Sequence, residues 1–260
     1  MTIRLIDPSR RIGKAPRSFL TIVRYPLARN TGPFPLIVFG HGFAVSPAPY
    51  ARLLDAWARA GYVVAAPVFP LENADHRGGP DEHDLPNQPG DMSLVITELS
   101  DRSLSGSGPL AGLLDPRRVA VTGQSDGGDT ALAAAYDPVV RDNRVGAAMI
   151  LSGAEDPFAA PFTMPPDGPP LLAVQGTADT INPPGDTYAF YRQAATPRIL
   201  LKLLGAGHQP PYTEPGPQLD AVQRTTIAFL DWRFKHRPAA LRTLLAVGSA
   251  GVGTSLTRAG

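Results

Sequence analysis

The sequence predicts an α/β fold in which helices cover both faces of a mostly parallel sheet. Short apolar, β-branched segments alternate with longer segments of helical periodicity, the order typical of parallel sheets. The 260 residues are within the size that one hydrophobic core supports. Hydrophobic residues make up 43% of the chain and charged residues 18%, which is too apolar for disorder. We therefore expect one domain over residues 1–260, with its core at about residues 20–235.

Seven segments have the length and the aliphatic, β-branched composition of buried strands. They are residues 21–25, 36–39, 62–69, 119–122, 147–151, 171–175 and 200–204. Helical segments separate most of them, so the strands should pair in parallel.

Four helices have recognisable bounds, and a further helix is expected between the last two strands. The four are residues 47–60, 90–100, 126–136 and 221–234. Ser46 can cap the first helix, Pro47 suits its first turn, and Gly61 ends it. Residues 248–260 are small and polar, so we expect a flexible, frayed C-terminal end.

The charge balance and the lack of cysteine exclude several classes of function. The net charge is +1, so the chain has no positive excess for a nucleic-acid backbone or an anionic membrane. No apolar run approaches the roughly 20 residues of a membrane span. Without cysteine, disulfides, thiolate nucleophiles and zinc–thiolate sites are excluded. Early charges argue against a signal peptide, so we expect a cytoplasmic protein or a secreted one whose leader is absent from this chain. The oligomeric state stays open, with a monomer as the default.

The pentapeptide Gly123-Gln124-Ser125-Asp126-Gly127 carries most of the chemical information. It has the pattern G-x-S-x-G, with a predicted strand before it and a predicted helix after it. In this setting, a nucleophile elbow, a strained turn exposes the serine hydroxyl and points the N–H of the next residue at the reaction centre. The alternative is a plain glycine-rich turn with a capping serine.

A serine nucleophile needs a general base, and the base needs an acid that fixes its tautomer. Asp179 follows the strand at 171–175 and His208 follows the strand at 200–204, which gives the order Ser, Asp, His. Asp179 could instead form a turn before Asn182. The rival catalytic acid is Asp156, which follows the preceding strand.

The segment Gly40-His41-Gly42-Phe43 follows the strand at 36–39 and can supply a second backbone donor for an oxyanion hole. The candidate donors are the N–H groups of Phe43 and Asp126. We interpret His41 as a structural residue of this loop, not as a second base.

These motifs resemble those of the α/β-hydrolase superfamily over roughly residues 20–235. The segment from Pro35 to Phe43, the entry Gly61-Tyr62-Val63-Val64 and the Gly-x-x-Asp at Asp179 are similar to the dienelactone-hydrolase-like branch. That branch includes chlorophyllase-like esterases, bacterial homologues of platelet-activating-factor acetylhydrolase, and cutinase-like polyester hydrolases. The resemblance implies an eight-stranded sheet, no cofactor or metal, and ester hydrolysis through an acyl-enzyme.

The same resemblance implies a triad of Ser125, Asp179 and His208, with Phe43 and Asp126 as oxyanion donors. One position departs from the pattern, because many relatives have an apolar or neutral residue where this chain has Asp126. The effect of that carboxylate on rate and substrate is therefore an open question.

The proline-rich segment 153–170 lacks a helical pattern, so no helical cap domain fits between the strands on either side of it. An open cleft near Phe43, Phe158, Phe162 and Tyr212 should accept apolar acyl or aryl esters, polyesters included. The same triad could hydrolyse amides or peptides, and a non-catalytic binding module with this fold is the alternative from another class.

The polar loop 71–89 is rich in acidic residues and histidine. Its members are Glu72, Asp75, His76, Asp81, Glu82, His83 and Asp84. Such a loop could bind a divalent cation, and the alternative is a solvated loop at the rim of the cleft.

Overall fold

The computed structural model describes residues 1–28, 32–247 and 253–260, and these form one nine-stranded sheet in the order β1-β2-β4-β3-β5-β6-β7-β8-β9. From β4 to β8, each neighbouring pair is parallel. Antiparallel strands add to both edges. The mostly parallel α/β architecture is the one that the sequence predicts.

The six central strands carry the apolar centre of the molecule. They are β3 (Phe34–Gly40), β4 (Val63–Pro67), β5 (Leu114–Gln124), β6 (Val145–Leu151), β7 (Leu171–Gly176) and β8 (Arg198–Leu203). β3, β4 and β7 are buried at every residue. The register pairs Gly40 with Gly123, so the carboxyl ends of β3 and β5 meet at one edge of the sheet. In a parallel sheet, this edge is where ligands bind.

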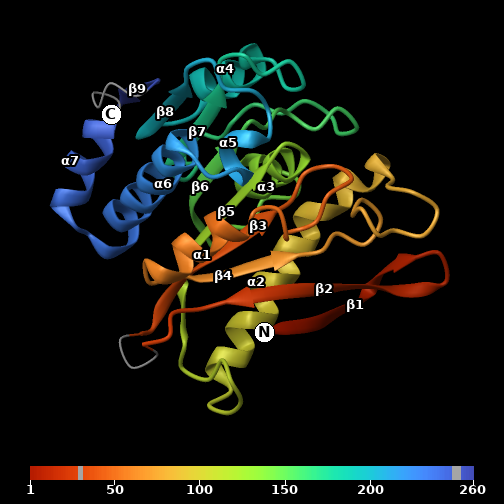
Figure 1. Cartoon of the computed structure of the whole chain (residues 1–260). Helices are drawn as coiled ribbons and strands as arrows, with labels where there is room; N and C mark the ends of the chain where they lie inside the picture. The colour runs from red at the N-terminus through yellow and green to blue at the C-terminus, as the bar shows by residue number, and fades with distance from the viewer. Residues whose placement is uncertain (29–31, 248–252) are drawn as a thin grey trace.

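Helices cover both faces of this sheet (Figure 1). One core layer contains side chains of α2 (Gln88–Leu104), α3 (Asp126–Tyr136) and α4 (Pro184–Gln193). The other contains side chains of α1 (Ala51–Arg59), α5 (Pro210–Thr213), α6 (Pro217–Lys235) and α7 (Pro238–Val247). On the second face, Trp57 Nε1 donates to Thr226 Oγ1 at 2.9 Å and joins α1 to α6.

The edges of the sheet differ from the prediction. β1 (Thr2–Ile12) and β2 (Ala15–Arg24) form a long hairpin that extends the core toward the N-terminus. The described sheet has nine strands and not the eight that the resemblance implies. Residues 254–259, predicted to be frayed, form β9 (Thr254–Ala259), which pairs with β8. That prediction is wrong because backbone hydrogen bonds to an open sheet edge can order a segment that buries little apolar surface. Residues 248–252 lie outside the described residues.

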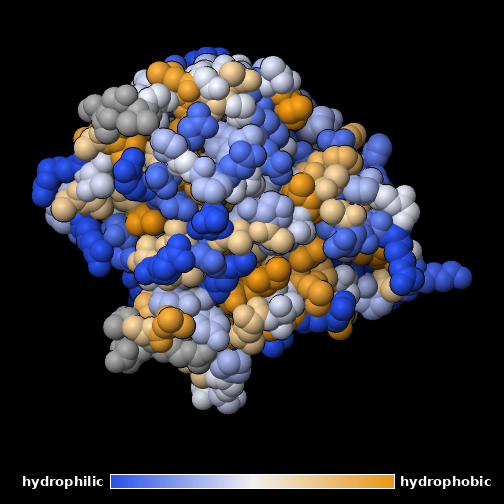
Figure 2. Space-filling model, in the orientation of Figure 1, coloured by the Kyte–Doolittle hydropathy of each residue, from blue (hydrophilic) through white to orange (hydrophobic). Residues whose placement is uncertain are grey.

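Between β6 and β7, segment 153–170 contains turns and no helix, in agreement with the expectation of no cap domain. Hydrophobic and hydrophilic residues are interspersed over the face in Figure 2, and hydrophobic residues gather where Figure 1 places β2 and β4. No helix in the described part of the chain is long and apolar enough to cross a membrane.

Candidate active site

Ser125 lies in a strained turn between β5 and α3. Its φ of 57° and ψ of −131° are rarely adopted by a residue with a side chain. The turn is held at both ends, because Ser125 N–H donates to the Leu151 carbonyl at 3.1 Å and Gly128 N–H donates to the Ser125 carbonyl at 2.6 Å. This is the geometry expected for a nucleophile elbow.

Glycines around Ser125 let three backbone segments approach one another. A Cβ on Gly123 would lie 1.9 Å from the Gly127 carbonyl oxygen, and a Cβ on Gly127 would lie 2.2 Å from the Gly40 carbonyl oxygen. Both distances are far below van der Waals contact, so neither position has room for a side chain. The two glycines of the G-x-S-x-G pattern therefore bring the start of α3 against the end of β3.

Asp179 and His208 lie in the loops that follow the neighbouring strands β7 and β8. His208 Nδ1 is 2.8 Å from Asp179 Oδ2. The other oxygen, Asp179 Oδ1, accepts the backbone N–H groups of Ile181 and Asn182, each at 3.0 Å. With Nδ1–H donated to Asp179, His208 keeps a lone pair on Nε2, which is the tautomer that a general base requires.

His208 Nε2 faces Gln124 and not Ser125. Gln124 Nε2 is 3.1 Å from His208 Nε2 and donates to the His208 carbonyl at 3.2 Å. The Tyr50 hydroxyl donates to Gln124 Oε1 at 2.6 Å, which fixes the orientation of this amide. Ser125 Oγ donates instead to Asp126 Oδ1 at 3.3 Å. Ser125 and His208 thus reach the same site without a hydrogen bond between them, as is common before substrate binds.

The backbone N–H groups of Phe43 and Asp126 belong to the two segments that meet at Ser125. A Cβ on Gly42 would lie 3.1 Å from Ser125 Cβ, so the loop after β3 is in contact with the elbow. Among the backbone hydrogen bonds of the described residues, none uses the N–H of Phe43 or of Asp126.

His41 supports this loop from inside the protein. It is fully buried, and its Nε2 accepts the Phe69 N–H at 3.0 Å while its Nδ1 lies 2.9 Å from the Gly42 carbonyl. These partners require a neutral ring with the proton on Nδ1. Burial lowers the pKa of His41 to about 4, in agreement with that tautomer.

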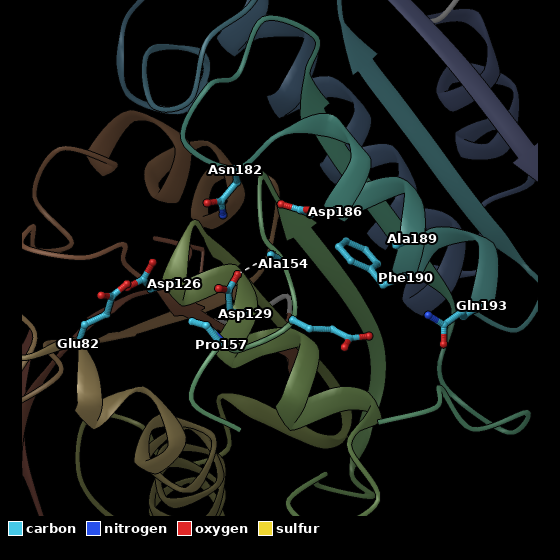
Figure 3. A pocket seen from close by; sticks show the side chains of 11 residues that line it. Glu82, Asp126, Asp129, Ala154, Pro157, Asn182, Asp186, Ala189, Phe190 and Gln193 are labelled. Carbon is cyan, nitrogen blue, oxygen red and sulfur yellow. Dashed lines mark hydrogen bonds between the residues drawn. The ribbon is translucent and has the colours of Figure 1, made fainter. Parts of the chain in front are cut away.

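A cleft of about 540 Å³ opens beside the elbow, between α3 and α4 (Figure 3). Asp126 lies at one end, and Asn182, from the Asp179 loop, borders it too. Ala154, Ala189 and Phe190 supply apolar surface. The polar lining is strongly acidic, with carboxylates from Glu82, Asp126, Asp129, Glu155 and Asp186.

Three acidic groups of this cleft, Asp129, Glu82 and Glu155, have raised pKa values. Burial, with the charges of Asp126, Asp156 and Glu82, raises the pKa of Asp129 well above its usual value, although Ala154 N–H donates to its Oδ1 at 2.6 Å. Burial also raises the pKa values of Glu82 and Glu155. An anionic substrate group would therefore meet a repulsive environment here.

None of the four aromatic residues predicted to bind substrate is among the residues that line this cleft. Tyr212 is completely buried and bonds to Ser152 Oγ at 2.8 Å, so its prediction as a substrate-binding residue is wrong. Phe158 packs on His83 with ring centroids 4.7 Å apart, and Phe162 borders a separate cleft of about 450 Å³. Phe43 is 42% exposed on the loop after β3.

The alternatives for the catalytic acid and for a cation site have their own contacts. Asp156 Oδ1 accepts the Phe158 N–H at 2.7 Å, whereas the histidine pairs with Asp179. In loop 71–89, Asp81 accepts the His83 N–H at 3.1 Å and caps the short helix η2 (Glu82–Asn87). Among the described residues, no group of three or more histidine or acidic side chains is placed to hold a metal ion.

Sequence reasoning missed Gln124 and placed Glu72 only in the polar loop 71–89. Gln124 is 1% exposed and contacts His208. In the sequence, the one sign of its role was its place directly before Ser125, at a position that the G-x-S-x-G pattern leaves variable. Glu72 is completely buried although it begins a polar loop.

Comparisons with known proteins show a family and a similar fold for this chain. The model of the chlorophyllase family matches residues 2–161. A ferulic acid esterase from Streptomyces cinnamoneus has a similar structure, with a TM-score of 0.74 and 21% identity, over 98% of this chain and 95% of that chain. No curated protein sequence matches the chain.

Proposed function

The chain belongs to the chlorophyllase family, and on that basis we propose that it hydrolyses carboxylic esters through an acyl-enzyme formed on Ser125. His208 is the general base, and Asp179 orients it. The backbone N–H groups of Phe43 and Asp126 stabilise the oxyanion.

In the acylation step, Ser125 Oγ attacks the ester carbonyl carbon and His208 Nε2 takes the hydroxyl proton. The carbonyl oxygen gains negative charge and accepts hydrogen bonds from the two N–H groups. When the tetrahedral intermediate collapses, the C–O bond to the alcohol breaks and His208 returns the proton to the leaving alkoxide. Water then repeats the sequence on the acyl-enzyme and releases the acid.

The observation that carries this proposal is the 2.8 Å bond between His208 and Asp179 at the edge of the sheet where Ser125 is held in a strained turn. The family match ends at residue 161, so it includes Ser125 but neither Asp179 nor His208. The pairing of the last two residues therefore supports the triad independently of the family.

The proposed substrates are neutral esters with apolar acyl or aryl groups, and polyesters are included because no cap encloses the site. The apolar wall at Ala189 and Phe190 supports an apolar group, whereas the surrounding carboxylates disfavour an anionic one. Hydrolysis of amides by the same triad remains the alternative reaction.

The test is a panel of p-nitrophenyl esters of increasing acyl length beside a p-nitroanilide, with Ser125→Ala and the surface control Ser107→Ala. Ester hydrolysis that Ser125→Ala abolishes and Ser107→Ala leaves intact supports the proposal. Faster cleavage of the anilide would favour the amidase. Binding of an ester without turnover by the wild-type protein would favour a binding module.

A further inference from the structure

Two buried carboxyl oxygens near the elbow lack a hydrogen-bond donor. Of the buried side-chain atoms without a partner in the described residues, the carboxyl oxygens are Glu72 Oε1 and Asp126 Oδ2. The two carboxyl groups lie close enough to interact, and this interaction raises the pKa of Glu72. Two ionised carboxylates would repel each other strongly at short range in a buried site, so we infer that one of them carries a proton.

The neighbours of the pair place the proton on Glu72. Thr130 Oγ1 donates to Gln88 Oε1 at 2.7 Å, so the Gln88 amide presents its Nε2–H groups to Glu72 Oε2. Glu72 Oε2 is thus an acceptor, which leaves Oε1 to hold the proton. Asp126 begins α3, where the helix dipole favours a negative charge, and its Oδ1 accepts the Ser125 hydroxyl.

Within the described residues, neither Glu72 nor Asp126 forms an ion pair with a cationic side chain. The titratable groups that face Glu72 or Asp126 are Asp84, Asp129, Glu82, Asp156, Tyr50 and the neutral His41. Arg17, in the same region, is bound to Asp84 and Asp91 at 2.6–2.7 Å. Burial, followed by the hydrogen bond to Asp126, raises the pKa of Glu72 to about 11.

We propose that Glu72 is a positioning residue of the active site: its Oε1–H donates to Asp126 Oδ2 and holds the Asp126 carboxylate away from the oxyanion hole. This role rests on the proposed function. The Glu72 carbonyl also accepts the Ala44 N–H at 3.1 Å, directly after Phe43. One buried residue thereby fixes both segments that supply oxyanion donors.

The shared proton is tested by unfolding, which needs no substrate. Between about pH 6 and 9, unfolded Glu72 is ionised while the folded pair keeps one proton, so wild-type stability falls as pH rises. Glu72→Gln keeps a donor toward Asp126 and removes this proton. The ratio of the wild-type unfolding constant to that of Glu72→Gln should therefore rise by up to about tenfold per pH unit.

The matched control for this measurement is Glu98→Gln, because Glu98 forms a solvent-exposed pair with Arg102 at 3.2 Å on α2. Its ratio should be flat over the same pH range. A Glu72→Gln ratio as flat as that of the control would overturn the proposal.

The positioning role is tested by kcat on a neutral p-nitrophenyl ester. Glu72→Gln should keep kcat within about threefold of the wild-type value. Glu72→Ala should lower kcat at least about tenfold, an effect that approaches the one seen when an oxyanion donor is removed. Adding Asp126→Asn to Glu72→Ala should restore most of kcat, since no carboxylate then needs to be held. A double variant whose kcat is no higher than that of Glu72→Ala would refute the positioning role. If Glu72→Ala does not fold, the unfolding ratio of Glu72→Gln still tests the proposal. If the chain is not an esterase, activity is missing from wild type and variants alike while the unfolding ratio still responds to pH.

Discussion

Asp179→Asn should inactivate the enzyme without unfolding it, and the contacts of Asp179 explain why. Its Oδ1 accepts two backbone N–H groups, from Ile181 and Asn182. An asparagine would keep its oxygen there, because its NH₂ group cannot accept those bonds. The NH₂ group would then replace Oδ2 and face His208 Nδ1.

This replacement reverses the tautomer of His208. With a donor opposite Nδ1, the imidazole must accept at Nδ1 and carry its proton on Nε2, where it can no longer take the proton of Ser125. In a serine protease the same change lowers kcat by about 10⁴, and we expect a loss of that order here. Gln175 cannot relieve the mismatch, because its Nε2 also points at Asp179 Oδ2 at 3.2 Å while its Oε1 accepts the Thr187 hydroxyl at 2.6 Å.

The measurement is kcat/KM for a p-nitrophenyl ester at neutral pH, with a thermal melt to show that the variant is folded. Asp156→Asn is the matched control, because Asp156 is the acid of the preceding loop and, within the described residues, accepts hydrogen bonds from Phe158 and Ala159 of its own turn. It should change kcat/KM by less than about tenfold. A folded Asp179→Asn that keeps a tenth of wild-type activity, or a larger loss in Asp156→Asn, would refute the assignment of the acid.

Four further outcomes follow from the site. Ser125→Ala should reduce kcat by up to about 10⁶, and a fluorophosphonate should label Ser125 alone by peptide mass; residual activity of a tenth would remove Ser125 as the nucleophile. Asp126→Asn should change kcat by less than about tenfold, since its backbone N–H survives, and a loss as large as that of Ser125→Ala would give the carboxylate a direct role. A half-ester with a free carboxylate in the acyl chain should react more slowly than its methylated analogue, with the difference shrinking in high salt and in Glu155→Gln; equal rates at low salt would refute repulsion by the cleft. His41 is neutral when folded, with its pKa lowered from 6.5 to about 4, so stability should be lost as pH falls from about 6.5 toward 4; a His41→Asn variant with the same acid profile in urea titrations would contradict this.

The elbow could be predicted from sequence because its constraints are local. Gly123 and Gly127 have no room for a side chain, and the strained Ser125 needs a strand before it and a helix after it. The order of the strands then places Asp179 and His208 at the ends of neighbouring strands. The pentapeptide and two loop residues were therefore enough to predict the strained turn at Ser125 and the pairing of Asp179 with His208.

Other features depend on contacts between distant segments and left no local signal. Glu72 looks like a solvated loop residue, and only the packing of α2 and α3 over it makes it buried. Tyr212 is an aromatic residue of the type that often lines a cleft, but its side chain points into the protein, where its hydroxyl bonds to Ser152 Oγ. β1 and β9 are the edge strands of the sheet and have many exposed residues, so their composition is not that of a buried strand.

The separation of Ser125 from His208 has a physical explanation in two polar networks. One runs from Tyr50 through Gln124 to His208 and Asp179, and the other runs from Ser125 through Asp126 to Glu72. To react, Ser125 Oγ must leave Asp126 Oδ1 and approach His208 Nε2, which lies 3.1 Å from Gln124 Nε2. The serine hydroxyl then replaces the Gln124 amide as the donor to His208 Nε2. Gln124 can keep its bond to the His208 carbonyl throughout, so in the proposed mechanism the serine turns while the histidine stays in place.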